Sequence, residues 1–168
     1  MSVWNYNVQD LQKVKTPLSV VEGLCEELSH VSKGKIIARV AEYDGAYKSE
    51  FPEDRYDYIP INAEPFFNVQ LIMGENARDD EHDNKFMYEL YVTSKNTPRY
   101  KYRVLIMYYS IDMYPVGLTI QENIAQEIGC KSEGILCKDE DSFMEVLEKI
   151  LGSNTLGSVL RNLAALNL

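Results

Sequence analysis

Residues 86–110 read FMYELYVTSKNTPRYKYRVLIMYYS, and this stretch decides the fold of the chain. Its two halves, Phe86–Ser94 and Arg99–Ser110, alternate apolar and polar residues with the period of two that marks a half-buried strand. One face carries Phe86, Tyr88, Leu90 and Val92 from the first half, and Tyr100, Tyr102, Val104, Ile106 and Tyr108 from the second. The stretch is therefore predicted to form a β-hairpin.

The register of this hairpin follows from its apolar residues, because a slip of one residue would turn the whole set to the other face. Both apolar sets occupy even positions, so the connecting loop must hold an odd number of residues. The segments Asn96–Pro98 and Ser94–Pro98 both satisfy this condition. The longer loop places Glu89 opposite Arg103, which would be a favourable cross-strand pair on the solvent face.

The segment before the hairpin is predicted to hold a helix and two further strands. Thr16 is a good N-cap and Pro17 suits the first helical position. Apolar residues then recur at helical spacing as far as Gly34, where the helix is expected to stop. Ile36–Tyr43 and Phe66–Met73 have the composition or alternation of strands.

The segment after the hairpin is predicted to be mainly helical. Tyr114–Leu118 is expected to add a short edge strand, and a capping box at Thr119–Glu122 then opens a helix that Gly129 closes. The acids of Asp139–Asp141 favour the N-terminus of the next helix through the helix dipole. Gly152 is expected to end this helix, and Ser153 is expected to be the N-cap of the last one.

This order of elements predicts the fold class. A helix, about four to five antiparallel strands in a meander, and then two to three helices indicate an α+β domain. We expect the C-terminal helices to cover one face of the sheet. The other face is expected to be more solvated, and it would carry Asn68, Gln70, Glu89, Tyr91, Lys101 and Arg103. The length of 168 residues and the lack of a linker favour one domain over 1–168.

The net charge of −9 at pH 7 restricts the partners that the chain is expected to bind. Direct binding of nucleic acid needs a surplus of Lys and Arg, so it is not expected, and neither is an anionic membrane surface. A basic protein is the favoured partner, although the charge also has a simpler role in keeping the protein soluble.

The three cysteines, Cys25, Cys130 and Cys137, form no dense pattern, which favours a reducing compartment. The first 15 residues lack the basic and apolar regions of a signal peptide, and the apolar runs are too short to span a bilayer. A cytoplasmic location is therefore expected. Cys25 is expected to act as a small hydrophobic residue on its helix rather than as a nucleophile.

Two acidic clusters are candidate sites. The loop around residues 74–85 holds Glu75, Asp79, Asp80, Glu81, His82 and Asp83. Such groups can bind a divalent cation, but their spacing is not that of an EF-hand, and a solvated loop is favoured. The acids of residues 42–57 include candidates for an acid/base pair, but a solvated acidic rim is favoured there too.

His30, near the end of the first helix, is expected to be structural. No metal and no cofactor are expected.

Tyrosine is the unusual feature of the composition, because eleven of the 12 tyrosines lie between Tyr43 and Tyr114. Tyrosine favours strands, but it also favours recognition surfaces. Tyr91 and Tyr109 fall on the predicted outer face, where they would form a recognition patch with Arg99 and Arg103.

No catalytic constellation stands out, so a binding protein is favoured over an enzyme. The first hypothesis is an acidic interaction module, such as an inhibitor or a toxin-immunity protein, that binds a basic partner. Its predicted contacts are Asp54, Asp57, Asp79, Asp80, Glu81, Glu89 and Tyr91. The alternatives are a dimeric secretion-type chaperone, an enzyme built from scattered carboxylates and tyrosines, and a nucleic-acid mimic.

Overall fold

The structure is a computed structural model that describes residues 3–12, 14–43, 85–130 and 134–166. Within these residues, one antiparallel sheet has its strands in the order of the sequence. The strands are β1 (Ile36–Glu42), β2 (Lys85–Ser94), β3 (Thr97–Ser110), β4 (Val116–Ile120) and β5 (Ile135–Cys137). The predicted meander is therefore confirmed.

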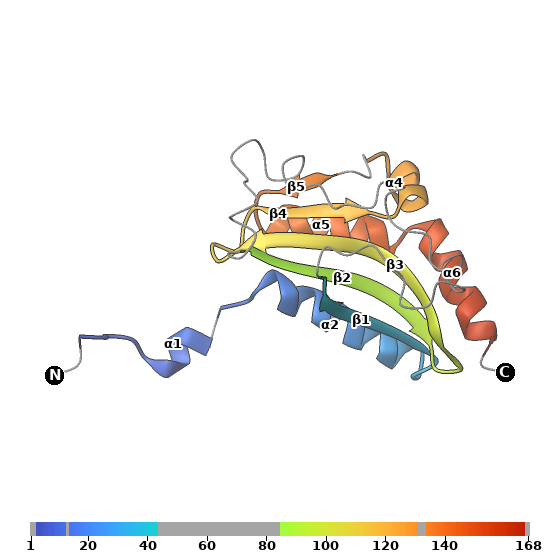
Figure 1. Ribbon diagram of the computed structural model, residues 1–168, viewed down its shortest axis with the longest axis horizontal. Coiled ribbons are helices and arrows are strands. Elements are labelled where there is room, and N and C mark those ends of the chain that lie inside the picture. The colour runs from blue at the N-terminus through green and yellow to red at the C-terminus, as the bar shows by residue number, and fades with distance from the viewer. Residues whose placement is uncertain (1–2, 13, 44–84, 131–133, 167–168) are drawn as a thin grey trace.

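The helices of the described residues pack mainly on one face of this sheet. They are α1 (Val8–Gln12), α2 (Pro17–Val31), α4 (Glu122–Ile128), α5 (Glu140–Leu151) and α6 (Asn154–Ala165). Figure 1 shows α2 and α5 behind the sheet, with α6 running beside it, while α1 stands away from the body. The predicted α+β arrangement, with one N-terminal helix before the sheet and helices after it, is confirmed apart from the additional short α1.

Local sequence signals set most of the helix ends. The Thr16 hydroxyl accepts a hydrogen bond from the Ser19 backbone N–H at 3.0 Å and caps α2. Gly129 ends α4 with φ of 76°, in the left-handed region that glycine adopts without strain. Asp139 caps α5 in a reciprocal pair with Ser142.

One helix start was predicted wrongly. Thr119 lies in β4 and is fully buried, and Gln121 caps α4 by accepting a hydrogen bond from the Ile124 backbone N–H at 3.1 Å. The chain stays in the sheet through Ile120 because Val116–Ile120 pairs with strands on both sides. β4 is thus an interior strand rather than the predicted edge strand over Tyr114–Leu118, and β5 is the edge.

The predicted register of the β2–β3 hairpin is also wrong. The loop has two residues, Lys95 and Asn96, because Ser94 pairs with Thr97. Two irregularities follow, and the one beside Leu90 leaves Val104 without a direct partner on β2, as in a β-bulge. Both predicted registers assume that the two strands pair without a bulge, because the alternation of apolar and polar residues does not indicate where a bulge occurs.

The bulge changes which residues of β3 face the helices. Leu105 pairs with Leu90, and Tyr109 pairs with Phe86, so the odd positions beyond the bulge join the core. The expectation that Tyr109 lies on the outer face is therefore wrong: Tyr109 is 3% exposed, and its ring stacks on Tyr88 with centroids 6.2 Å apart. Ile106 takes the opposite face instead, where it is also buried.

The core lies between the sheet and the helices. Apolar residues of α2, α5 and α6 pack against those of β2, β3 and β4 in one cluster. The helical and strand residues with no exposed surface include Val21, Val104, Leu118, Ile120, Ile124, Phe143, Leu147 and Ile150. The predicted strand Phe66–Met73 lies outside the described residues.

Candidate functional site

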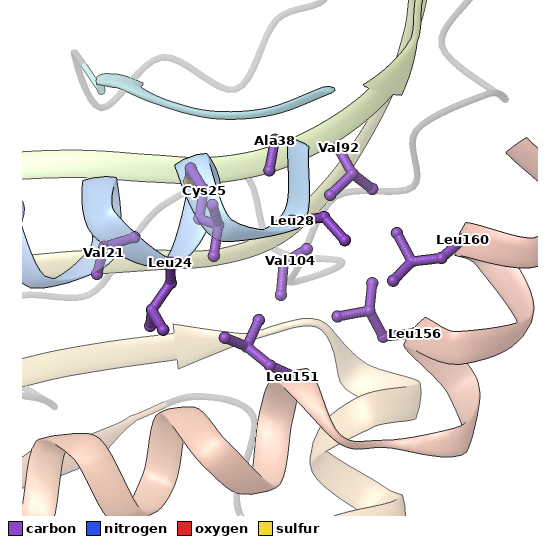
Figure 2. Close-up of a pocket in the computed structure, with 11 residues that line it drawn as sticks. Val21, Leu24, Cys25, Leu28, Ala38, Val92, Val104, Leu151, Leu156 and Leu160 are labelled. Carbon is purple, nitrogen blue, oxygen red and sulfur yellow. The ribbon is translucent and has the colours of Figure 1, made fainter. Parts of the chain in front are cut away.

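An apolar groove opens on the helical face of the sheet, between α2 and the corner where α5 meets α6 (Figure 2). It encloses a cavity of about 90 Å³, enough for the tip of one aliphatic side chain. Its lining residues are Val21, Leu24, Cys25, Leu28, Ala38, Leu90, Val92, Val104, Leu151, Leu156 and Leu160. Because these side chains are almost entirely apolar, the groove favours an apolar occupant over water.

Each wall of the groove follows from a local sequence pattern. The α2 wall uses Val21, Leu24, Cys25 and Leu28, which recur at i, i+3, i+4 and i+7 and therefore share one helical face. The floor comes from alternate positions of β1 and β2 together with the bulged Val104. The far wall is Leu151 at the end of α5 and two leucines of α6, which point toward Val104 in Figure 2.

The far wall is held in place by caps at the start of α6. The Ser153 hydroxyl accepts a hydrogen bond from the Leu156 backbone N–H at 3.2 Å. Glu127 of α4 reaches the same helix end and accepts from the backbone N–H groups of Asn154 at 2.6 Å and Thr155 at 2.8 Å. These hydrogen bonds hold the pKa of the Glu127 carboxyl below its ordinary value. The carboxylate also suits the positive end of the helix dipole.

Two of the three helices that border the groove, α2 and α5, carry exposed acids, whereas α6 has no acid and one arginine, Arg161. α2 carries the exposed Glu22, Glu26 and Glu27 and contains neither Lys nor Arg. α5 carries the exposed Asp141, Glu145 and Glu148, and its one lysine pairs with Glu145 at 3.6 Å. The exposed charge on the α2 and α5 sides of the groove is therefore mainly negative.

Cys25 is the one titratable residue that lines the groove. Burial raises the pKa of its thiol to about 11, and the nearby Glu22 and Glu26 add to the rise. The thiol is therefore protonated at neutral pH, and it behaves as the small hydrophobic residue that its place in the sequence suggests. Among the described residues that line the groove, no two form an acid/base pair.

Two of the predicted partner contacts, Glu89 and Tyr91, lie on the opposite face of the sheet, on either side of Leu90 in β2. Glu89 is only 5% exposed, and both of its carboxylate oxygens are engaged. Lys101 pairs with one oxygen, and the Arg103 Nε donates to the other at 2.7 Å. The pairing of Glu89 with Arg103 was expected, but it forms diagonally, because Glu89 stands directly opposite Ile106.

Aromatic rings complete this cluster, which we call the Glu89 cluster (Glu89, Lys101, Arg103, Tyr91 and Tyr43). The Lys101 ammonium lies 4.4 Å from the Tyr91 ring centroid, and the Arg103 guanidinium lies 5.4 Å from that of Tyr43. Its carboxylate faces cations of its own chain, so the cluster has the geometry of a structural ion pair.

The expectation of a solvated outer face is wrong at the centre of the sheet. Ile106, Tyr108 and Thr119 lie on the same face as Glu89 and are buried as well. Arg39 and Arg99 are exposed, and Tyr91 is half-buried. Of the other residues assigned to this face, Asn68 and Gln70 lie outside the described residues.

The remaining predicted contacts cannot be placed by the structure. Residues Asp54, Asp57, Asp79, Asp80 and Glu81 all fall in the segment 44–84, which lies outside the described residues. The same holds for the candidate cation loop around His82. Among the residues that the structure does describe, no three His, Cys, Asp or Glu side chains gather as metal ligands. In the same residues, no helix has the length and apolarity to cross a membrane.

A second, more open hollow of about 280 Å³ lies between the start of β3 and the end of α6. Its lining residues are Thr97, Tyr100, Val159, Asn162, Leu163 and Leu166.

Comparisons with known proteins give this chain no family. No protein-family model matches it, and no curated protein and no solved structure matches it significantly. The groove itself is therefore the basis for any functional assignment.

The groove is not predictable from sequence periodicity alone. Leu24 and Leu28, and likewise Leu156 and Leu160, recur at helical spacing and therefore belong to apolar helical stripes. A stripe predicts that a residue faces inward, but it does not predict whether two neighbouring helices close over the sheet. The available signal was the acidic composition of α2, which has no basic residue to balance it.

Proposed function

We propose that this protein is an acidic interaction module that binds a basic, apolar-anchored segment of another protein in the groove between α2 and the α5–α6 corner. The observation that carries the proposal is an apolar groove in which two of the three bordering helices, α2 and α5, carry exposed carboxylates. Apolar anchors would enter the groove, and Lys or Arg side chains would pair with the acids beside it.

The energetics support a modest, salt-dependent interaction. Filling an apolar cavity of about 90 Å³ contributes about 2 kcal/mol, if each Å³ is worth about 24 cal/mol. Exposed charge pairs each add little to affinity, but together they accelerate the encounter and select a basic partner. An inhibitor of a basic protein fits this pattern, and the acids of residues 54–81 would extend the same attraction.

The proposal is tested by titrating the protein with fluorescent peptides and following anisotropy. The probe is an amphipathic 15-residue peptide with leucines at helical spacing and lysines on its other face. We expect it to bind more tightly than an acidic peptide with the same leucines, with at least a tenfold loss of affinity between about 50 and 200 mM salt.

Matched leucine variants locate the site. Leu160→Gln places a polar group in the groove wall and should weaken binding at least tenfold. Leu136→Gln is the control, because Leu136 is a 45% exposed leucine on β5 that does not line the groove. Equal binding of the acidic and basic peptides, or equal losses in the two variants, would contradict the proposal.

A secretion-type chaperone is the second candidate, and the apolar groove also favours it. A chaperone would hold an extended apolar client with little preference for charge. Binding that is insensitive to salt and to peptide charge, but is lost in Leu160→Gln, would favour the chaperone over the acidic module.

A further inference from the structure

The segment before α2 carries a row of exposed apolar side chains, and we call residues 3–14 the N-terminal arm. Its large apolar residues are between 60% and 95% exposed: Val3, Trp4, Tyr6, Val8, Leu11 and Val14. Figure 1 shows the arm extending away from the body of the protein. Exposed apolar surface that is concentrated in this way marks an interaction site.

The spacing within the arm suits a helix that docks into a groove. Trp4, Val8 and Leu11 stand at i, i+4 and i+7, the positions at which an amphipathic helix presents its anchors. The structure already forms one turn, α1, that brings Val8 and Leu11 to one side. Asn7 caps this turn by accepting a hydrogen bond from the Gln9 backbone N–H at 3.0 Å.

The charge of the arm complements the groove. Residues 3–15 contain Lys13 and Lys15 against a single acid, Asp10, while α2 and α5 beside the groove carry exposed acids. The arm is thus an apolar and weakly basic segment, which is the chemistry that the groove attracts.

The base of the arm directs it away from the groove of its own chain. Lys15 pairs with Glu140, the first residue of α5, at 3.2 Å. The groove extends from Val21, in the second turn of α2, to its far wall at Leu151, which lies about 17 Å from Glu140 along α5. Thr16 is extended before Pro17, so the chain enters α2 without reversing.

From these observations we propose that the arm of one copy docks in the groove of a second copy, so that two chains exchange arms in a twofold dimer. The proposal rests on the groove being a binding site, as in the proposed function. A twofold exchange fills both grooves and covers both arms at once, whereas a one-way contact would leave one of each open. Leu11 is the anchor that would enter the cavity, and Val8 would pack against the groove wall beside it.

The first test is the mass of the full-length protein by sedimentation equilibrium over a range of concentrations. We expect a dimer whose dissociation constant rises at least tenfold in the arm variant Val8→Asp/Leu11→Asp and in the groove variant Leu160→Gln. Leu136→Asp is the matched control on a distant exposed leucine and should leave the dimer unchanged. A monomer at all concentrations, or a dimer unaffected by the arm variant, would overturn the proposal.

The second test traps the contact with a native cysteine. Leu11→Cys is introduced with Cys130→Ser, and the protein is oxidised near pH 9 so that some of the Cys25 thiol in the groove is ionised. We expect a disulfide-linked dimer on a non-reducing gel, lost when Cys25→Ser is added. A link between Cys25 and residue 11 of the same chain would overturn exchange between copies.

The failure of this proposal is distinguishable from failure of the proposed function. The basic peptide is titrated against the arm variant Val8→Asp/Leu11→Asp, in which the groove is open. Tight peptide binding to a wild-type protein that is monomeric would reject the exchange and keep the binding function. An arm-dependent dimer that binds no peptide would reject the function and keep the exchange.

Discussion

At the scale of single residues, the Glu89 cluster shows how strongly burial decides what a charged side chain does. Glu89 has the sequence context of an outward-facing acid, yet it is 5% exposed and lies between Lys101 and Arg103. A buried ion pair is a weak source of stability in itself, but removing one partner leaves charge without compensation in a medium of low dielectric.

We therefore predict that Glu89→Ala destabilises the protein by about 3 kcal/mol, because Arg103 would keep its charge in a mostly buried site. Urea denaturation measures the change. Glu145→Ala is the control, since Glu145 is an exposed acid paired with Lys149, and it should cost no more than about 0.5 kcal/mol. Similar losses in the two variants would show that the Glu89 cluster is not a buried charge network.

At the scale of elements, the position of α6 determines the shape of the groove. Leu156 and Leu160 line the groove only because the chain breaks at Gly152 and restarts with Ser153 as the N-cap. The Glu127 carboxylate of α4 then accepts hydrogen bonds from the first backbone N–H groups of α6 and so connects the two helices. The groove wall thus depends on caps that lie outside the groove itself.

Ser153→Ala is predicted to lower the free energy of unfolding by about 1 kcal/mol, because the Leu156 backbone N–H loses its acceptor. Ser158→Ala is the matched control within the same helix. Its exposed hydroxyl accepts a hydrogen bond from the Arg161 side chain at 3.2 Å, and the loss of this hydroxyl should cost no more than about 0.5 kcal/mol. Urea midpoints of the two variants compare the costs directly, and a larger loss in Ser158→Ala would contradict the assignment of Ser153 as the cap.

At the scale of the whole molecule, the core holds several groups that resist ionisation. Burial raises the pKa of Cys25 and Cys137 to about 11 and that of Tyr102 and Tyr109 to about 12. In the unfolded chain, the cysteine thiols release their protons near pH 9 and the tyrosine hydroxyls near pH 10. Each raised pKa favours the folded state while the group is protonated in both states, and this contribution disappears as the group ionises.

The protein is therefore expected to lose stability as the pH rises from about 9 to 12. Above pH 9 the unfolded chain binds fewer protons than the folded one, so the free energy of unfolding falls with increasing pH. Urea midpoints at pH 7 to 12, followed by circular dichroism, measure the loss. Tyr109→Phe removes one of the groups and should make the curve shallower; a curve that is flat to pH 12 would contradict the burial of these groups.

The sequence by itself determined the elements of this fold and most of their ends. The helices after Thr16 and Asp139 and the strands of residues 36–42 and 86–110 arise from interactions within a few residues, namely caps, periodicity and turns. Such local signals depend only on residues that are close in the sequence, so the α+β arrangement could be predicted without tertiary contacts.

Only the tertiary structure decided the faces and the site. The bulge at Val104 reverses which residues of β3 face the helices, so that odd-numbered residues beyond it lie in the core. No local sequence pattern predicts the bulge, because it depends on how β2 and β4 pair with β3. The groove likewise depends on the distance between α2 and α6, which are more than a hundred residues apart in the chain. The register of paired strands and the spacing of packed helices are set by long-range packing, and this is why the predicted acidic contacts did not reveal the groove.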